Sequence, residues 1–244
     1  MELQKYFDNE ANSVLICPLY GQGEAMYSHN ANRVFKTASI IKTFVLAYYL
    51  EYCKDFDRVI EIPRKMLIGT SIMTELRITK ATVKELLVWM MSFSDNSATN
   101  ALFLDADMDK INLFCKEVLG TEHTVIGRKM LDYAAVERGE DNLSCLNDCL
   151  KVMRYVINNP LGRDIMSRHK GVERIVRYVY DMDVEYYGKG GSIPDVYNDI
   201  AVLRKKDGEY MFVGVFSYKY DSAKIKRLMG CAGLAALGAE RPVV

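Results

Sequence analysis

The order of strand and helix patterns along this chain limits its possible folds more than any other feature. Two short apolar or alternating runs, residues 13–19 and 25–28, flank a turn pattern over residues 20–24 and predict a hairpin. Much later in the chain, three further strand patterns are separated by tight turns, at residues 183–191, 197–204 and 210–218. We expect a last helix over about residues 222–237, where small apolar residues share one face.

Helical periodicity dominates the chain between the two strand groups, with breaks at Gly120, at Gly139 and at Asn159-Pro160. The two groups can share one antiparallel sheet only if the chain leaves the sheet and returns. We therefore predict an α/β (α+β) fold in a single domain spanning residues 1–244, in which a five-stranded antiparallel sheet is flanked by helices. An all-helical lobe of about residues 56–182 is inserted into an α/β lobe made of about residues 1–55 and 183–244.

Composition excludes several classes of function. Lys plus Arg (32) equals Asp plus Glu (32), so no bulk charge attracts nucleic acid or an anionic membrane. The six cysteines form no C-x-x-C pair, and with three histidines no zinc spacing arises, so we expect reduced thiols, no metal and no cofactor. We see neither a signal-peptide core nor a run that could span a bilayer, and we expect a soluble, cytoplasmic monomer.

A serine and a lysine three residues apart, Ser39 and Lys42, stand at the start of an apolar run. A serine hydroxyl needs a base within hydrogen-bonding distance to act as a nucleophile, and residues i and i+3 share a helix face. Burial against side chains such as Phe44 would lower the pKa of the lysine, and the helix N-terminus would direct free N–H groups at an oxyanion. The spacing alone decides little, because Ser167 and Lys170 share it in a charged stretch.

Two further stretches carry side chains that suit acyl transfer. The Ser94 hydroxyl could pass a proton to a leaving group, and the Asn96 carboxamide could bind both a substrate amide and Lys42. In residues 189–192, Lys-Gly-Gly-Ser, a lysine supplies a positive field at a strand edge that paired glycines leave open to a substrate backbone. Taken singly, the first stretch could be a helix cap and the second a glycine bulge.

Together, and in this order, the motifs S-x-x-K, S-D-N and K-x-G resemble those of the penicillin-recognising serine hydrolases, most closely the class A β-lactamases, over nearly the whole chain. The resemblance implies the two-lobe fold predicted above and a small-molecule or peptide acyl substrate. It also implies roles for individual residues: nucleophile Ser39, base or proton relay Lys42, proton shuttle Ser94, and substrate-binding Asn96, Lys189, Gly191 and Ser192. By the same resemblance, the backbone N–H groups of Ser39 and Ser192 form the oxyanion hole.

The sequence departs from the family pattern at two places. Gly190 replaces the hydroxyl residue that binds the substrate carboxylate, a role that Ser192 could take over. Ala135, three residues after Asp132, stands where a water-activating loop glutamate is expected, and the nearby Glu137 and Glu140 have the wrong spacing. We therefore expect acylation at Ser39 followed by slow deacylation.

Three kinds of function stay open from the sequence. The first is a serine hydrolase acting on the amide bond of a β-lactam or on a related amide, peptide or ester. The second is a penicillin-binding-protein-like sensor or binding protein, or an intracellular transacylase or esterase. The third is a pseudoenzyme kept for its partner surface. Such a protein would not need the full set of Ser39, Lys42, Ser94, Asn96 and Lys189. Outside the motifs, Arg204 could add to a carboxylate-binding field, and Tyr187 or Tyr197 could line the cleft.

Overall fold

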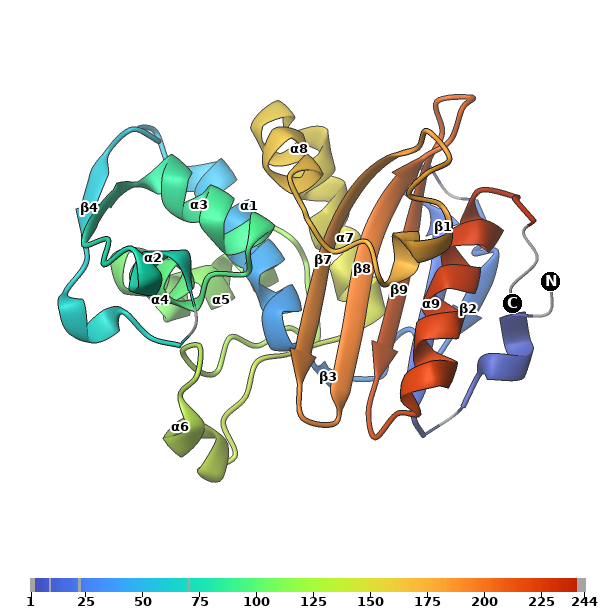
Figure 1. Ribbon diagram of the computed structural model, residues 1–244, viewed down its shortest axis with the longest axis horizontal. Helices are drawn as coiled ribbons and strands as arrows, with labels where there is room; N and C mark the ends of the chain where they lie inside the picture. The colour runs from blue at the N-terminus through green and yellow to red at the C-terminus, as the bar shows by residue number, and fades with distance from the viewer. Residues whose placement is uncertain (1–2, 9, 22, 70, 241–244) are drawn as a thin grey trace.

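The computed structural model describes residues 3–8, 10–21, 23–69 and 71–240, so that Gln22, within the turn expected over residues 20–24, lies outside the described residues. Its centre is one antiparallel five-stranded sheet in the order β2-β1-β9-β8-β7 (Figure 1). The strands are β1 (Asn12–Pro18), β2 (Tyr27–His29), β7 (Glu185–Ile193), β8 (Val196–Arg204) and β9 (Tyr210–Ser217). Because β1 pairs with β9 over its whole length, the N-terminal and C-terminal strand groups complete a single sheet, which confirms the predicted fold class.

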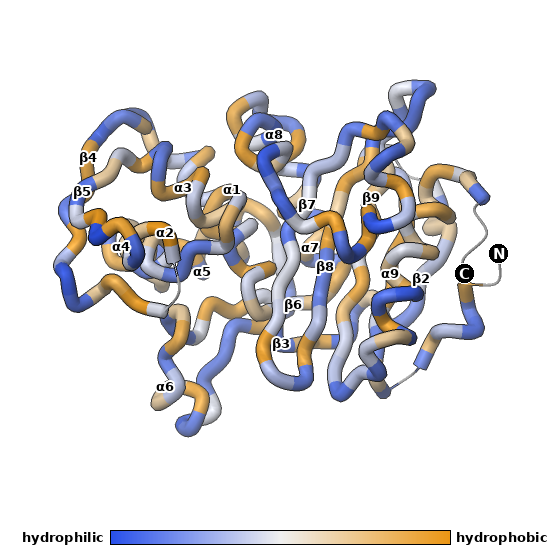
Figure 2. Tube along the Cα trace, viewed as in Figure 1, coloured by the Kyte–Doolittle hydropathy of each residue, from blue (hydrophilic) through white to orange (hydrophobic). Residues whose placement is uncertain are grey.

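Alternation of side chains gives the sheet two apolar faces. Along β1, Val14 and Ile16 face a cluster formed with α9 (Ser222–Ala236), η4 (Ile175–Tyr178) and η1 (Leu3–Tyr6). The intervening Leu15 and Cys17 face the second, larger cluster, to which α7 (Leu146–Asn158) belongs. Hydrophobic residues accordingly recur along β8 and β9, whereas the turn between these two strands is hydrophilic (Figure 2).

The remaining helices gather beside the β7 edge of the sheet around α1 (Lys42–Tyr52), much of which is buried (Figure 1). A Thr82–Glu85 capping box begins α3, as the sequence predicts. The other elements of this region are η3 (Arg64–Met66), α2 (Ile72–Glu75), α3 (Val83–Ser92), α4 (Asn96–Ala106), α5 (Met108–Glu117), α6 (Tyr133–Glu137) and α8 (Pro160–Ser167). Since α7 contacts both α1 and the sheet, the lobe boundaries proposed from sequence stay a prediction.

The structure differs from the sequence prediction in local detail. The helix expected from Ser39 begins as a 3₁₀ turn, η2 (Ala38–Ile41), before α1 starts at Lys42. We also expected Gly162 to separate helices together with Pro160, but Gly162 lies inside α8, because Asn159 caps α8 and Pro160 occupies its first turn. Two short strand pairs were not predicted, since two or three residues show no alternation. They are β3 (Phe35–Lys36) with β6 (Leu143–Ser144), and β4 (Val59–Glu61) with β5 (Lys80–Thr82).

Candidate active site

Long-range hydrogen bonds fix the backbone that leads into Ser39. Asn142, at the end of a loop over residues 128–142, accepts hydrogen bonds through its carbonyl oxygen from the Thr37 backbone N–H (2.9 Å) and hydroxyl (3.1 Å). The Asn198 side chain on β8 donates to the carbonyl oxygen of Lys36 at 2.9 Å. Ala38 has a φ of 49°, a left-handed conformation that a side chain disfavours. Ser39 is thus presented, partly exposed, on a constrained turn.

Lys42 lies fully buried at the first residue of α1. Its Nζ donates hydrogen bonds to the Ser94 carbonyl oxygen (2.7 Å), to Ser94 Oγ (3.1 Å) and to Asn96 Oδ1 (2.8 Å). Burial, and secondly the nearby Lys189 charge, hold the pKa of Lys42 well below its usual value. The direct hydrogen bond to Ser39 that the i, i+3 spacing led us to expect is absent among the described residues, because three acceptors from residues 94–96 surround the amine instead.

The S-D-N stretch lies where α3 ends and α4 begins. Asp95, buried, caps α4 by accepting from the Ala98 N–H (2.9 Å) and also accepts from the Met73 N–H (3.2 Å), so the middle residue serves as an anchor. Ser94 has a φ of 57°, again in the left-handed region. In this conformation Ser94 and Asn96 both accept hydrogen bonds from the Lys42 amine.

Lys189 on β7 reaches the same hydroxyl from the sheet. Its Nζ donates to Ser94 Oγ (3.1 Å) and to the Gly190 carbonyl oxygen (2.7 Å). Burial, and secondly the charge of Arg174, lower the pKa of Lys189 to about 7. Since Ser94 Oγ accepts from both lysines, its own O–H is left to donate to another group.

Gly191 brings the β7 backbone directly against the turn that carries Ser39. A Cβ at this position would lie 2.7 Å from the Thr37 carbonyl oxygen and 2.8 Å from the Ser39 amide nitrogen. Such contacts to backbone atoms cannot be relieved by rotating a side chain. The absence of a side chain at Gly191 therefore allows the β7 backbone to lie this close to the turn that carries Ser39.

Arg174 is a site residue that sequence reasoning missed. A Cβ at Gly190 would lie 2.9 Å from Arg174 Nε, so the guanidinium occupies the space that a side chain at position 190 would need. The guanidinium donates to Ser192 Oγ (2.7 Å) and to the Asn198 carbonyl oxygen (2.6 Å), and it stacks on the Tyr197 ring 3.9 Å away. No motif surrounds Arg174 in the sequence, and its role follows from the fold.

A cavity of about 280 Å³ opens beside these groups. Ser39, Asn96 and Ser192 line it together with apolar residues of the loop over residues 128–142. Among the described residues that line this cavity, Asp141 carries the only carboxylate, and it is paired with Arg128 (2.8 Å) and Lys36 (3.1 Å).

The structure also places the loop residues that bear on deacylation. Ala135, where a water-activating glutamate was expected, is buried and does not line the cavity, whereas Met130 does. Asn100 fixes the Met130 backbone by accepting from its N–H (2.8 Å) and donating to its carbonyl oxygen (3.1 Å). Neither Glu137 nor Glu140 lines the cavity, and Glu140 pairs with Arg138.

Two other residues considered from the sequence lie outside the site. Arg204 forms an exposed ion pair with Glu185 (2.7 Å), and the Tyr187 hydroxyl donates to the same carboxylate (2.9 Å). Tyr197 contributes only as the ring beneath Arg174.

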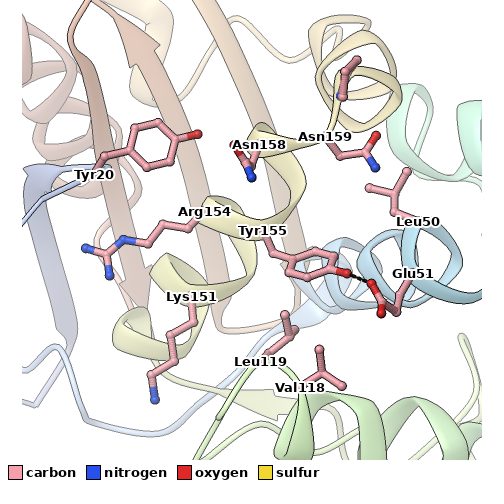
Figure 3. Close-up of a pocket in the computed structure, with 11 residues that line it drawn as sticks. Tyr20, Leu50, Glu51, Val118, Leu119, Lys151, Arg154, Tyr155, Asn158 and Asn159 are labelled. Atoms are coloured by element: carbon pink, nitrogen blue, oxygen red, sulfur yellow. Dashed lines mark hydrogen bonds between the residues drawn. The ribbon is translucent and has the colours of Figure 1, made fainter.

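A larger cavity, of about 670 Å³, lies away from these residues, between the ends of α1 and α7 (Figure 3). In it the Tyr155 hydroxyl donates to Glu51, and none of the motif residues takes part. We therefore place the candidate active site in the smaller cavity. No helix in the described part of the chain is both long and apolar enough to cross a membrane.

Comparisons with known proteins agree with this geometry. A family model described as the beta-lactamase enzyme family matches residues 2–238. Among solved structures, a class A β-lactamase from Mycobacterium abscessus is 22% identical, with a TM-score of 0.82 and 97% of each chain covered. A β-lactamase from Sphaerobacter thermophilus is 21% identical, with a TM-score of 0.81 over 98% of this chain and 97% of that one. PBP-A is 17% identical, with a TM-score of 0.80 over 96% and 94%. At these identities the structures share the fold, and no curated protein matches the chain significantly.

Proposed function

The chain belongs to the β-lactamase enzyme family, and on that premise we propose that it is a serine hydrolase that is acylated at Ser39 and deacylates slowly. The observation that carries the proposal is the fully buried Lys42 amine, held by Ser94 and Asn96 beside the cavity that Ser39 lines. A lysine whose pKa is held well below its usual value by burial loses its proton more readily and can then act as a base.

In the acylation step, the neutral Lys42 amine gives up one of its three hydrogen bonds, so that its lone pair can take the Ser39 proton as Ser39 Oγ attacks the substrate carbonyl carbon. The backbone N–H groups of Ser39 and Ser192 stabilise the oxyanion. Collapse of the tetrahedral intermediate breaks the bond to the leaving group, which takes a proton from the Ser94 hydroxyl. Ser94 is then reprotonated from Lys42, since the two atoms are 3.1 Å apart.

Substrate positioning falls to the polar groups around these atoms. Asn96 Oδ1 accepts from Lys42, so its Nδ2 can donate to a substrate carbonyl. Lys189 and Arg174 supply a positive field at the β7 edge, and Ser192 between cavity and guanidinium takes the place of the missing hydroxyl at position 190. We assign the binding of a substrate carboxylate to Lys189, Arg174 and Ser192 together.

Slow deacylation follows from the surroundings of the acyl group. Hydrolysis needs a base that activates water, and the cavity's carboxylate, Asp141, is already neutralised by two cations. A persistent acyl-enzyme is the state that a penicillin-binding sensor would use, so this second function is favoured by the same observation.

The test is the intact mass of the protein over time with a penicillin and, separately, with an activated ester, for the native chain and Ser39→Ala. A Ser39-dependent adduct that persists supports slow deacylation, and one that decays quickly with release of product refutes it. Decay only when an amine or alcohol acceptor is added would indicate a transacylase. No adduct with either reagent would refute the proposed acyl-enzyme chemistry. Size-exclusion chromatography of the same sample tests the expected monomer.

A further inference from the structure

The walls of the cavity beside Ser39 are mostly apolar. Four apolar residues of the loop over residues 128–142 contribute to one wall, and the last residue of β7 contributes to the other together with the proline that follows it. These residues are Met130, Leu131, Tyr133, Val136, Ile193 and Pro194. Leu131 and Tyr133 are 37% and 69% exposed, which leaves their apolar surface free at the rim of the cavity.

The apolar wall is held in place by specific contacts. The two hydrogen bonds from Asn100 fix Met130, and Asp132 caps α6 by accepting from the Ala135 N–H at 3.0 Å. Between them, Leu131 has a φ of 61°, a conformation that costs free energy for a residue with a side chain. In that conformation its side chain packs on Gly69, where a Cβ would lie 2.7 Å from Leu131 Cδ1.

Each charged residue that lines the cavity is engaged in an ion pair, the two cations Lys36 and Arg128 with the single anion Asp141. Arg128 and Asp141 are both 8% exposed and paired at 2.8 Å, and Asp141 also pairs with Lys36 at 3.1 Å. A charged group entering the cavity would have to compete with these pairs or be desolvated. An uncharged apolar group would gain contact with the walls at no such cost.

We propose that this cavity is the acyl-chain subsite, and that the substrate is an ester or amide whose acyl part is an uncharged apolar chain or ring. The inference rests on the proposed acylation at Ser39. With an ester, Ser39 Oγ bonds to the carbonyl carbon, the bond from that carbon to the leaving oxygen breaks, and the serine proton ends on the leaving alcohol. The acyl chain then extends from Ser39 between the two apolar walls.

The experiment uses 4-nitrophenyl acetate, butanoate and hexanoate, together with the anionic 4-nitrophenyl hydrogen glutarate. The second-order acylation rate constant is taken from the burst of nitrophenol and checked by intact mass, with Ser39→Ala as the background. Because each buried methylene contributes a factor of about three to four, we expect a rise of about tenfold from acetate to butanoate. We expect the glutarate ester to react more slowly than the hexanoate ester.

Two cavity variants and one matched control test the location. Leu131→Ser and Val136→Thr remove apolar surface from the wall and should each reduce the ratio of the hexanoate to the acetate rate constant about threefold or more. Leu113→Ser changes a leucine that is 59% exposed on α5, outside this cavity, and should leave the ratio unchanged.

The outcomes separate this inference from the proposed function. Ser39-dependent acylation that is indifferent to chain length, or faster with the glutarate ester, would overturn the apolar subsite and leave the acyl-enzyme intact. A chain-length preference that neither cavity variant reduces would place the acyl group elsewhere and overturn the assignment as well. No adduct with any ester would remove the proposed function, and the subsite with it.

Discussion

Lys42 and Lys189 direct their amines at a single oxygen atom. Each nitrogen lies 3.1 Å from Ser94 Oγ, one from the first residue of α1 and the other from the middle of β7. Both side chains are buried, so the protonated form of each is disfavoured by desolvation and by neighbouring cations. Both amines therefore lie within hydrogen-bonding distance of the hydroxyl, as the proposed proton transfers require.

The first prediction concerns the pH dependence of acylation. Lys42 must be neutral to accept the Ser39 proton, so the rate should fall as the pH drops through the pKa of Lys42. The charge of Lys189 is one cause of that lowered pKa, so Lys189→Met should raise the pKa of Lys42. The fall in rate on the acidic side should then occur at higher pH. The measurement is the acylation rate constant from pH 5 to 10.

Lys206→Met is the control for this prediction, because Lys206 is an exposed lysine at the turn between β8 and β9. It should leave the profile in place. If the fall in acylation rate occurs at the same pH in Lys189→Met, or at a lower pH, then Lys42 is not the base whose titration the profile reports.

A second prediction follows from the contact between β7 and η2. In Gly191→Ala the new methyl group would overlap the Thr37 carbonyl oxygen and the Ser39 amide nitrogen, and β7 must move away. We expect acylation to slow about 100-fold, the usual effect of losing one oxyanion-hole donor. Gly23→Ala, whose Cβ would meet only the Pro18 ring at 3.4 Å, should retain the native rate. Native-like acylation by Gly191→Ala would remove the Ser39 and Ser192 N–H groups from the proposed mechanism.

The third prediction tests whether the Arg174 guanidinium occupies the space that a hydroxyl side chain at position 190 would need. In Gly190→Thr the new side chain would displace the Arg174 guanidinium, which lies 2.9 Å from the Cβ position. We expect Gly190→Thr to lower the melting temperature and the acylation rate, and Arg174→Ala to restore room for threonine. The double variant should therefore be less impaired than the sum of the single changes, with a coupling free energy of about 1–3 kcal/mol.

Arg177, on η4 with its guanidinium near Tyr178, provides the matched control for this comparison of single and double variants. Arg177→Ala should not rescue Gly190→Thr. Strict additivity between Gly190→Thr and Arg174→Ala would show that the two positions do not share the same space.

The sequence was sufficient to predict the sheet and the gathering of the motifs. The strand pattern around β1 and β7–β9 and the order of the three motifs are local signals, and the structure brings Lys42, Ser94, Asn96 and Lys189 together. Their catalytic roles stay predictions. The fold class was accessible because a five-stranded sheet needs both strand groups, which alternation identifies.

The features of the site that could not be predicted from the sequence depend on contacts between residues far apart in the chain. Arg174 stands in a stretch without periodicity, and it reaches Ser192 only because η4 packs against the sheet. In the sequence, the spacing from Asp132 pointed to Ala135 as the position where a water-activating glutamate is expected. The structure instead turns Met130 toward the cavity, because Asn100, thirty residues earlier, binds its backbone.

The last prediction uses that difference to restore turnover. Met130 lines the cavity next to Ser39, so Met130→Glu would place a carboxylate where a water molecule could approach the acyl carbon. We expect deacylation to accelerate at least about tenfold, within the range of general-base catalysis, while acylation changes little.

The matched control is Met130→Gln, whose side chain has the same shape as glutamate but cannot act as a base. The decay of the adduct mass after removal of excess penicillin gives the rate. Because Met130 is buried, the carboxyl pKa will be raised by desolvation, and the gain should therefore increase as the pH rises through that value. Equal decay in the two variants, at every pH, would mean that the slow step is limited by access of water and not by the missing base.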